Sequence, residues 1–409
     1  MIRLPARFTR WLDTDIPYLL SSGGWTGGGQ IFGTFAGLIT AYVFAHFLPQ
    51  DAYGTYKYVL ATIALLGIPT LSGMNTAVVQ AIAQHADGTA AAAMRKRFAL
   101  GLLSTLGGLS LGAYYFYRHN ELLGWAFVVA AFVIPVMETL STAQSILVGK
   151  KRFDIAARQT ILTSLLTTSA VVGAIFITKD PLWIVIAYLL ATLLGRSITY
   201  FVSRRFIENT EVSRENLRFG MHLSFAAVLG TIAGNADIFL LWHTSTPQTL
   251  ALYAFALATV SPFQSLMKSV FNLAQPKFAA QTKEQLRMTV PRRARQSYLL
   301  LAPIVFIAII ALPWLYELLF PKYAAAVPYA QVLTLSVLFY SEKLYSTALT
   351  TLRRTKALYV LNITNALVQV LLLGILIPLF GGWGAVAALF IQRVVAAIIT
   401  RSFFYYQTR

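Results

Sequence analysis

Residues 122–152 read LLGWAFVVAAFVIPVMETLSTAQSILVGKKR, and this stretch decides the class of fold. Its first 28 residues contain one charged side chain, Glu138, and the three residues that follow are Lys150, Lys151 and Arg152. About 20 apolar residues in a helix cross the roughly 30 Å hydrocarbon core of a bilayer, and a basic cluster after them stays in the cytoplasm. The stretch therefore predicts a transmembrane helix that ends on the cytoplasmic side.

The composition extends this interpretation to the whole chain. Of 409 residues, 57% are hydrophobic and 12% are charged, whereas soluble proteins contain about 25% charged residues. A soluble chain this apolar could not cover its surface with polar groups, so much of its surface must face lipid. The apolar runs do not alternate in polarity as the strands of a membrane β-barrel do. We expect an all-α integral membrane protein embedded in a phospholipid membrane.

The apolar runs predict about twelve transmembrane helices. They lie at residues 21–47, 56–82, 97–117, 122–148, 156–178, 182–202, 219–243, 249–275, 294–317, 326–349, 357–380 and 383–406. The loops between them are short, so we expect no sizeable soluble domain on either side. Prolines inside a helix remove a hydrogen bond and bend it. Kinks are therefore expected at Pro69, Pro135, Pro262, Pro303, Pro313 and Pro378.

Lysine and arginine gather on alternate loops. If the N-terminus is cytoplasmic, the cytoplasmic segments hold 25 of the 33 basic residues and the outer loops hold 4. The clusters include Arg95-Lys96-Arg97, Lys150-Lys151-Arg152 and Arg204-Arg205. Because short basic loops remain in the cytoplasm, the pattern predicts that both termini are cytoplasmic. The net charge of +18 is then a basic rim facing anionic headgroups, and no nucleic-acid partner is expected.

The chain repeats itself at an offset of 197 residues. Gly33-Thr34-Phe35-Ala36-Gly37 matches Gly230-Thr231-Ile232-Ala233-Gly234, and residues 23–84 show fifteen identities in 62 positions. Six helices per half mean that both halves enter the membrane from the same side, so the repeats are parallel. We expect a six-helix bundle at 1–202, a cytoplasmic linker at 203–218 and a second six-helix bundle at 219–409.

Ionisable side chains inside the apolar runs are the main candidate functional residues. A charge in hydrocarbon costs several kcal/mol, so such groups usually face a protein interior or a water-filled path. The charged candidates are Glu138, Arg196, Asp237, Lys268, Glu342, Lys343 and Arg393. Gln264, Lys268 and Asn272 recur every four residues and share one helix face. We expect such polar faces to line a central cavity, although the same groups could join helices without touching a ligand.

Three of the candidates are carboxylates with an expected role in ion coupling. A carboxylate removed from water can exchange a proton near neutrality, which suits transport driven by H⁺ or Na⁺. Asp237, Glu138 and Glu342 are the predicted coupling residues. The alternative for each is a structural pair with a nearby cation. Arg196 lies close in sequence to Arg204, so it either reaches the cytoplasmic interface or belongs to the site.

The sequence contains no catalytic signature. Cysteine is absent, the five histidines are dispersed without ligand spacing, and neither a G-x-x-x-x-G-K-[ST] nor a G-x-S-x-G motif is present. We therefore expect a protein that is not an enzyme. No metal or cofactor is expected besides the coupling ion.

Several motifs resemble one family. Leu48-Pro49-Gln50-Asp51-Ala52-Tyr53-Gly54-Thr55-Tyr56 looks like the L-x-x-x-x-[YF]-G-x-[YF] turn of polysaccharide and O-antigen (Wzx-type) flippases. Also similar are the Asp237-containing helix, Leu250-Ala251-Leu252-Tyr253 and Gly381-Gly382-Trp383-Gly384-Ala385. These flippases belong to the multidrug/oligosaccharidyl-lipid/polysaccharide (MOP) exporter superfamily. The resemblance spans essentially the whole chain.

The resemblance implies a MATE-like fold, in which two six-helix bundles surround a cavity that opens alternately to each side of the bacterial cytoplasmic (inner) membrane. The implied substrate is a lipid-linked (polyprenyl-pyrophosphate) oligosaccharide, moved from the inner to the outer leaflet. Lys268, Lys343 and Arg393 would hold the pyrophosphate or acidic sugars. The polar residues expected to contact the sugar or line the cavity are Gln30, Asn75, Asn235, Gln264 and Asn272. Other polysaccharide-assembly membrane proteins are candidate partners.

Gln30 also marks a departure from one branch of the superfamily. Lipid II flippases have about fourteen helices and an arginine-rich first helix, whereas the first helix here has Gln30 and no arginine. The departure favours a glycan other than the peptidoglycan precursor.

Two other functions remain open. A drug or cation antiporter of the same superfamily would favour an acidic cavity, whereas the intramembrane charges here are four bases and three acids. A membrane glycan polymerase or ligase would have a large external loop, and the longest external loop predicted here has about ten residues. The flippase interpretation agrees best with the charges and with the short loops.

Overall fold

The computed structural model describes residues 16–272, 278, 281–352 and 355–408, with the side chains of all of these except 16–27, 30, 31, 265–272, 351 and 355–357. Within these residues the chain is helical and no strand occurs, so the all-α class is confirmed. The α-helices are α2 (Ile16–Phe47), α3 (Gln50–Leu66), α4 (Met74–Ala83), α5 (Gly88–Tyr117), α6 (Glu121–Leu140), α7 (Thr142–Gly149), α8 (Phe153–Ile177), α9 (Pro181–Ser203), α10 (Arg214–Thr244), α11 (Pro247–Asn272), α13 (Lys283–Leu319), α14 (Val327–Leu335), α15 (Lys343–Thr351) and α16 (Thr355–Gln407). Short 3-10 segments, η1 (Ile68–Thr70), η2 (Arg204–Phe206), η3 (Pro321–Ala326) and η4 (Ser336–Glu342), connect some of them.

The described helices agree with the twelve passes predicted from the sequence. Eight are long and apolar enough to span a bilayer, and the bent pair α3–α4 is a ninth if it counts as one span. That pair bends by 44° at the segment that contains Pro69, as expected. α16 counts once among the eight, but a non-helical residue at Gly381 divides it into two passes. α2 and α11 are not among these spans, but they lie at the passes predicted at 21–47 and 249–275.

The turn that divides α16 depends on glycine. Gly381 has φ +55°, a backbone conformation that residues with a Cβ rarely adopt. A Cβ at Gly384 would collide with the carbonyl of Leu376, so the two arms of α16 approach each other closely here. The resulting hairpin brings the second arm, with Arg393, back beside the first.

The outer surface of the helices is apolar. On α13, Leu299, Leu300, Phe306, Trp314 and Leu318 are between 65% and 80% exposed. In water such a stripe would promote aggregation, whereas lipid tails are as apolar as these side chains. The structure therefore agrees with the membrane location that the composition predicts.

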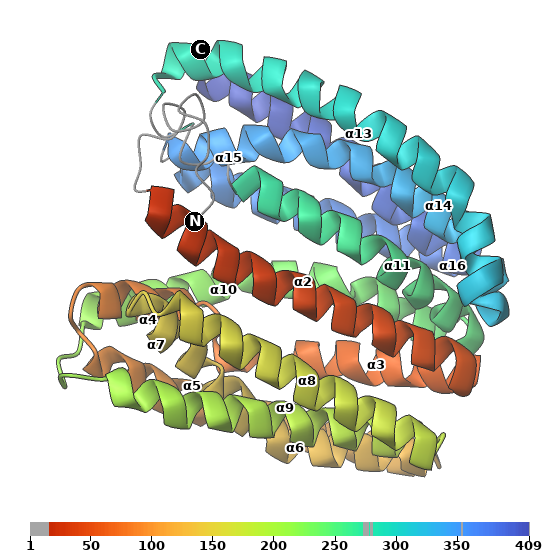
Figure 1. Cartoon of the computed structure of the whole chain (residues 1–409). Helices are drawn as coiled ribbons and strands as arrows, with labels where there is room; N and C mark the ends of the chain where they lie inside the picture. Colours follow the sequence, from red (N-terminus) through yellow and green to blue (C-terminus); the bar gives the residue numbers. More distant parts are fainter. Residues whose placement is uncertain (1–15, 273–277, 279–280, 353–354, 409) are drawn as a thin grey trace.

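The two halves of the chain meet where α10 and α11 of the second half lie along α3 and α4 of the first (Figure 1). Gly54 permits this approach, because a Cβ there would collide with the backbone of Pro247. Nearby, the ring of Tyr58 stacks on Trp242 with centroids 4.4 Å apart and an interplanar angle of 10°. Glycine and aromatic side chains together close the contact between the halves at this end.

The segment between the halves is fixed to the first half by a buried ion pair. α9 ends at Ser203 and α10 begins at Arg214. The ammonium of Lys150 lies 2.8 Å from the fully buried carboxylate of Asp87 and 3.1 Å from Glu208 of this segment. The Glu208 amide also donates to Asp87 at 2.8 Å. A lysine of the predicted cytoplasmic cluster thus has a structural role.

Lys150→Gln is expected to lower the unfolding temperature of the detergent-purified protein at neutral pH. Burial lowers the pKa of Lys150, but its hydrogen bonds to Asp87 and Glu208 outweigh burial, so the pKa lies above the usual 10.5. When the pKa of a lysine is higher in the folded than in the unfolded protein, its ion pair stabilises the fold fully at a pH below the unfolded-state pKa. This stabilisation is lost as the pH rises through the folded-state pKa. The difference in unfolding temperature between the wild type and Lys150→Gln should therefore persist up to pH 10.5 and shrink above it.

The neighbouring residue supplies the control for this prediction. Lys151 is exposed, and Lys151→Gln should leave the unfolding temperature unchanged. If Lys150→Gln lowered the unfolding temperature as much at about pH 11 as at neutral pH, the ion-pair explanation would be contradicted.

Candidate functional site

The predicted site residues lie in three groups. One group is inside the first half of the chain, one is on α10 and α11, and one surrounds a pocket in the second half. The group in the first half contains Asn75 and Glu138. The group on α10 and α11 contains Asn235, Asp237 and the half-buried Gln264. The group around the pocket contains Glu342, Lys343 and Arg393. The side chains of three further candidates lie outside the described residues, namely Gln30, Lys268 and Asn272.

In the first half, one guanidinium group sits where two broken helices meet. Arg97 of α5 is 0% exposed. Its Nε donates at 2.7 Å to the carbonyl of Thr70, in the interruption between α3 and α4. Its Nη1 donates at 2.6–3.0 Å to Asn75, to Ser141 at the junction of α6 and α7, and to Thr142. Arg97 thereby satisfies polar groups that the two breaks expose within the membrane.

Glu138 connects this arginine to a second one. Its Oε1 lies 2.7 Å from Nη1 of Arg196, and its Oε2 lies 3.6 Å from Nη2 of Arg97. The same Nη1 of Arg196 donates to the carbonyl of Met137 at 2.8 Å. Arg196 is therefore held by α6 rather than extended to the membrane interface. Two cations share one carboxylate, which leaves a net positive charge inside the first half.

The prediction that Arg97 belongs to a basic loop is wrong. α5 begins at Gly88, nine residues before the predicted start, so Arg97 lies in its third turn. Arg95 and Lys96 beside it are exposed, whereas Arg97 points into the bundle. Successive residues of a helix point in different directions, so a run of three basic residues places only some of them at the surface.

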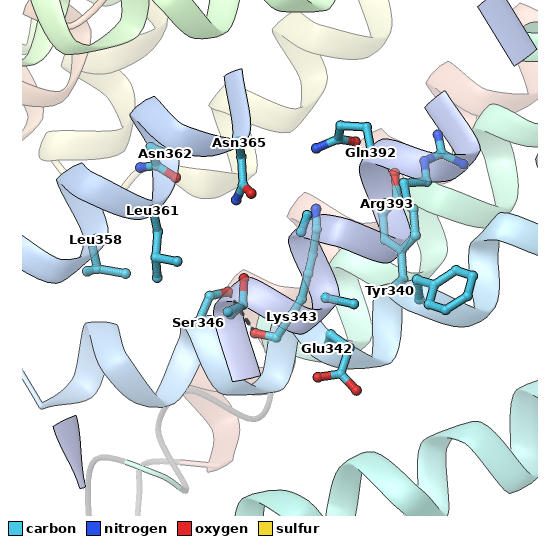
Figure 2. A pocket seen from close by; sticks show the side chains of 14 residues that line it. Tyr340, Glu342, Lys343, Ser346, Leu358, Leu361, Asn362, Asn365, Gln392 and Arg393 are labelled. Carbon is cyan, nitrogen blue, oxygen red and sulfur yellow. Dashed lines mark hydrogen bonds between the residues drawn. The ribbon is translucent and has the colours of Figure 1, made fainter. Parts of the chain in front are cut away.

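The second half contains a polar pocket of about 320 Å³. The end of η4, α15 and both arms of α16 line it. Figure 2 shows the Lys343 ammonium pointing into the space that Asn365 and Gln392 border. The polar lining consists of Tyr340, Glu342, Lys343, Ser346, Asn362, Asn365, Gln392, Arg393 and Thr400. Two cations beside three amides can bind an anionic group and neighbouring hydroxyls in one cavity.

Uncharged groups hold Arg393 in this pocket. Its Nη1 donates to the hydroxyl of Ser336 and, at 3.5 Å, to the carbonyl of Leu333. Its guanidinium carbon lies 5.5 Å from the centre of the Tyr340 ring. Within the described part of the chain, no carboxylate forms an ion pair with Arg393. The cation can therefore bind an anion that enters the pocket.

Glu342 lines the same pocket but is turned away from its neighbour Lys343. Figure 2 shows its carboxylate on the other side of the helix from the Lys343 ammonium. Glu342 is 6% exposed, and its Oε1 accepts a hydrogen bond from the Tyr298 hydroxyl at 2.9 Å. Its Oε2 is buried without a hydrogen-bond partner among the described residues. An oxygen in this position is suited to take up a proton or a cation.

Asp237 is buried at the contact of α10 with α11 and is 5% exposed. Its Oδ2 accepts from the Tyr253 hydroxyl at 2.5 Å, and its Oδ1 accepts from the amide of Ile238 at 2.8 Å. Among the described residues no cation forms an ion pair with Asp237, as the alternative of a structural pair would require. Asn235, two residues earlier, donates to the Thr231 carbonyl of its own helix.

These carboxylates are single groups rather than a metal centre. No set of three or more histidine, aspartate or glutamate side chains that could hold a metal occurs in the ranges that the structure describes. Asp237 and Glu342 therefore do not belong to such a cluster within these ranges.

Comparison with known proteins relates this geometry to a family. Residues 19–253 match the family model described as "Polysaccharide biosynthesis protein". The chain belongs to this family. The matched region contains the Arg97 network and the Asp237–Tyr253 pair. Membership in the polysaccharide biosynthesis family confirms the resemblance to polysaccharide flippases of the MOP superfamily. No match was found among curated proteins.

Solved structures show the same fold as this member of the polysaccharide biosynthesis family. "Lipid II flippase MurJ, inward closed conformation" matches with TM-score 0.70 and 13% identity over 93% of this chain and 86% of that one. A MOP superfamily transporter from Pyrococcus furiosus matches with TM-score 0.65 and 15% identity over 97% and 99%. MATE in complex with MaD5 matches with TM-score 0.66 and 14% identity over 95% of each chain. The MATE-like fold is therefore confirmed, and the apolar helices agree with a multi-pass membrane protein.

Proposed function

We propose that this transporter flips a lipid-linked oligosaccharide, attached to a polyprenyl pyrophosphate, from the cytoplasmic to the outer leaflet by alternating access. The main supporting observation is the pocket that places Arg393 and Lys343 beside amide side chains within an apolar bundle. Such a pocket suits a molecule that is anionic at one end and rich in hydroxyls elsewhere. A relative in fold is named a lipid II flippase, and the family is named for polysaccharide biosynthesis.

The side chains have distinct roles in this proposal. Arg393 and Lys343, with Lys268 of α11, bind the pyrophosphate or an acidic sugar. The hydroxyls of the glycan contact the polar residues Gln30, Asn235, Gln264 and Asn272. Asn75 is the weakest of the predicted contacts, because its Oδ1 accepts from Arg97 and its Nδ2 donates to Ser141.

Ion coupling is proposed to depend on Asp237 or Glu342. Both are buried carboxylates that hydrogen-bond a tyrosine hydroxyl and form no ion pair among the described residues. Glu138, the third predicted coupling residue, is less suited because both its oxygens already face guanidinium groups. H⁺ and Na⁺ are both compatible with a single carboxylate.

The proposed location is the bacterial cytoplasmic (inner) membrane, with both termini in the cytoplasm. The basic clusters on alternate loops support this orientation. The glycan would then leave the cytoplasm for a surface polysaccharide such as the O-antigen of lipopolysaccharide. Other membrane proteins of polysaccharide assembly would receive it on the outer face, so this chain itself would need no enzymatic step.

Reconstitution into liposomes tests the proposed function. A fluorescent polyprenyl-pyrophosphate oligosaccharide should become accessible to a membrane-impermeant quencher faster in liposomes that contain the protein than in liposomes without it. A fluorescent cationic drug, offered with a pH gradient, tests the antiporter alternative in the same vesicles. Transport of the drug without movement of the glycan would favour the antiporter over the flippase.

A further inference from the structure

The fourth pass of each half is broken at the same place. In the first half the break is the junction at Ser141, between α6 and α7. The repeat offset of 197 residues places its counterpart at Leu338, inside the 3-10 segment η4. The two broken passes have nearly the same length, 29 residues at Glu121–Gly149 and 30 at Pro321–Thr350. The breaks are therefore structural counterparts, but their surroundings differ.

Arg97 holds the break of the first half. Its Nη1 donates to the hydroxyls of Ser141 and Thr142 at 3.0 and 2.8 Å. Its Nε donates to the carbonyl of Thr70, in the break of the second pass. One guanidinium group thus connects two broken passes. Neither pass can bend further without losing hydrogen bonds to a charged donor, which are stronger than neutral ones.

The second half has apolar residues at the corresponding positions. The counterpart of Arg97 is Ala294, which is 2% exposed and belongs to the same apolar cluster as Leu344 and Tyr345 of α15. The counterparts of Glu138, Ser141 and Thr142 are apolar as well. In that order they are Leu335, Leu338 and Phe339. None of these four side chains can form a hydrogen bond, so they cannot replace the polar connection that Arg97 makes in the first half.

The bonding of η4 itself is less favourable than that of an α-helix. It is a 3-10 segment of seven residues, and the hydrogen bonds of a 3-10 helix have poorer geometry than those of an α-helix. The Ser341 hydroxyl and one oxygen of Glu342 are buried without a hydrogen-bond partner among the described residues. Buried polar atoms of this kind are unfavourable. A different conformation of η4 therefore sacrifices little.

Two cavities border η4 and leave room for such a change. Tyr340 and Glu342 line the polar pocket of about 320 Å³. Leu338 lines an apolar groove of about 430 Å³, which is bounded on α13 by residues between Ala302 and Ile309. Protein interiors are otherwise close-packed, with few voids larger than a water molecule. η4 can therefore shift without displacing a packed core.

We propose that η4 is a hinge, at which the second half bends when the transporter changes between its two open states, while Arg97 keeps the first half rigid. The inference goes beyond the proposed function, because it concerns the motion of the protein and not the identity of the transported molecule. Mid-helix 3-10 segments often mark functional hinges. Since Tyr340 and Glu342 belong to the pocket lining, each bend at η4 also changes the shape of the pocket.

Hydrogen exchange of backbone amides in the purified whole protein, measured by mass spectrometry, tests the hinge. The amides of residues 336–342 should exchange at least about tenfold faster than those of their counterparts, residues 139–145. Arg97→Lys keeps the charge but loses the rigid fork of donors. It should therefore raise exchange at 139–145 and leave exchange at 336–342 unchanged.

Filling the apolar groove provides the second variant. Ala302 is exposed in the wall of the groove, so the larger ring of Ala302→Phe enters open space beside η4. This variant should slow exchange at 336–342 and slow flipping of the glycan, each by at least about threefold. Ile307→Phe is the control, because Ile307 is 65% exposed on the same helix and lies outside the groove. It should exchange and flip as the wild type does.

The outcomes separate the hinge from the proposed function. Equal exchange at 336–342 and 139–145 in the wild type would overturn the hinge, even if the wild type flips the glycan. Ala302→Phe that exchanges as the wild type does at η4, or that slows exchange there but flips at the wild-type rate, would also overturn it. If the wild type moves no glycan but the exchange pattern is as expected in all variants, the hinge stands and the flippase proposal fails.

Discussion

Replacing Arg97 by methionine is expected to lower the free energy of unfolding by about 3–5 kcal/mol, because it removes one partner of a buried ionic network. The Thr70 carbonyl at the helix break and the Asn75 side chain would lose a donor. Glu138 would keep Arg196 as its only ion-pair partner. Lipid offers no water to satisfy these groups, so the loss cannot be compensated from outside.

The measurement is the unfolding temperature and the monodisperse yield of the detergent-purified protein. Lys96→Met is the matched control, since Lys96 is the preceding residue on the same helix and is exposed. It should behave as the wild type does, because exposed substitutions usually change stability by less than about 0.5 kcal/mol. Equal unfolding temperatures for the two variants would show that Arg97 does not stabilise the two helix breaks.

The transmembrane passes were the most predictable part of the fold. The pass predicted at 156–178 is α8 at Phe153–Ile177, and the pass predicted at 182–202 is α9 at Pro181–Ser203. Both are bounded by short polar loops, and an apolar run of this length has few alternatives to a helix in a membrane. Where charges sit inside a pass, as in α5, the same reasoning placed the helix start nine residues too late.

A signal for the inward position of Arg97 was present in the sequence. Ala93, Arg97, Gly101 and Ser104 are spaced by three or four residues and are all buried in α5. Small residues at this spacing mark the face on which membrane helices pack closely, so an arginine among them points inward. Its partners could not be predicted in this way, because they come from breaks in α3–α4 and α6–α7 that only the folded chain brings together.

The pocket of the second half was predictable in its members but not in its geometry. Lys343 and Arg393 stood out as charges within apolar runs, and the structure brings them to one cavity. Glu342 stood out equally, yet its carboxylate faces Tyr298 on another side of the helix. Adjacent helical residues point in different directions, and only the packing of η4 against α13 decides which of the two faces the cavity.

Arg393→Gln is expected to slow flipping of the lipid-linked glycan by at least about 30-fold while leaving the protein folded. Truncating one partner of a buried charge pair costs about 2–5 kcal/mol, and 2 kcal/mol corresponds to about 30-fold. Arg393 is only half-buried and forms no ion pair among the described residues, so the packing of α16 should survive. Initial flipping rates in liposomes, normalised to the amount of monodisperse protein, give the measurement.

Arg196→Gln is the matched variant in the first half of the chain. Comparing the two variants decides which arginine binds the transported glycan. Arg196 is ion-paired with Glu138, so its loss should lower the unfolding temperature, while the folded fraction should flip the glycan at nearly the wild-type rate. Arg393→Gln should show the opposite pattern, with a preserved unfolding temperature and little flipping. If both variants lose stability and flipping to the same degree, the two arginines have equivalent structural roles, and the second half has no special function in binding the anion.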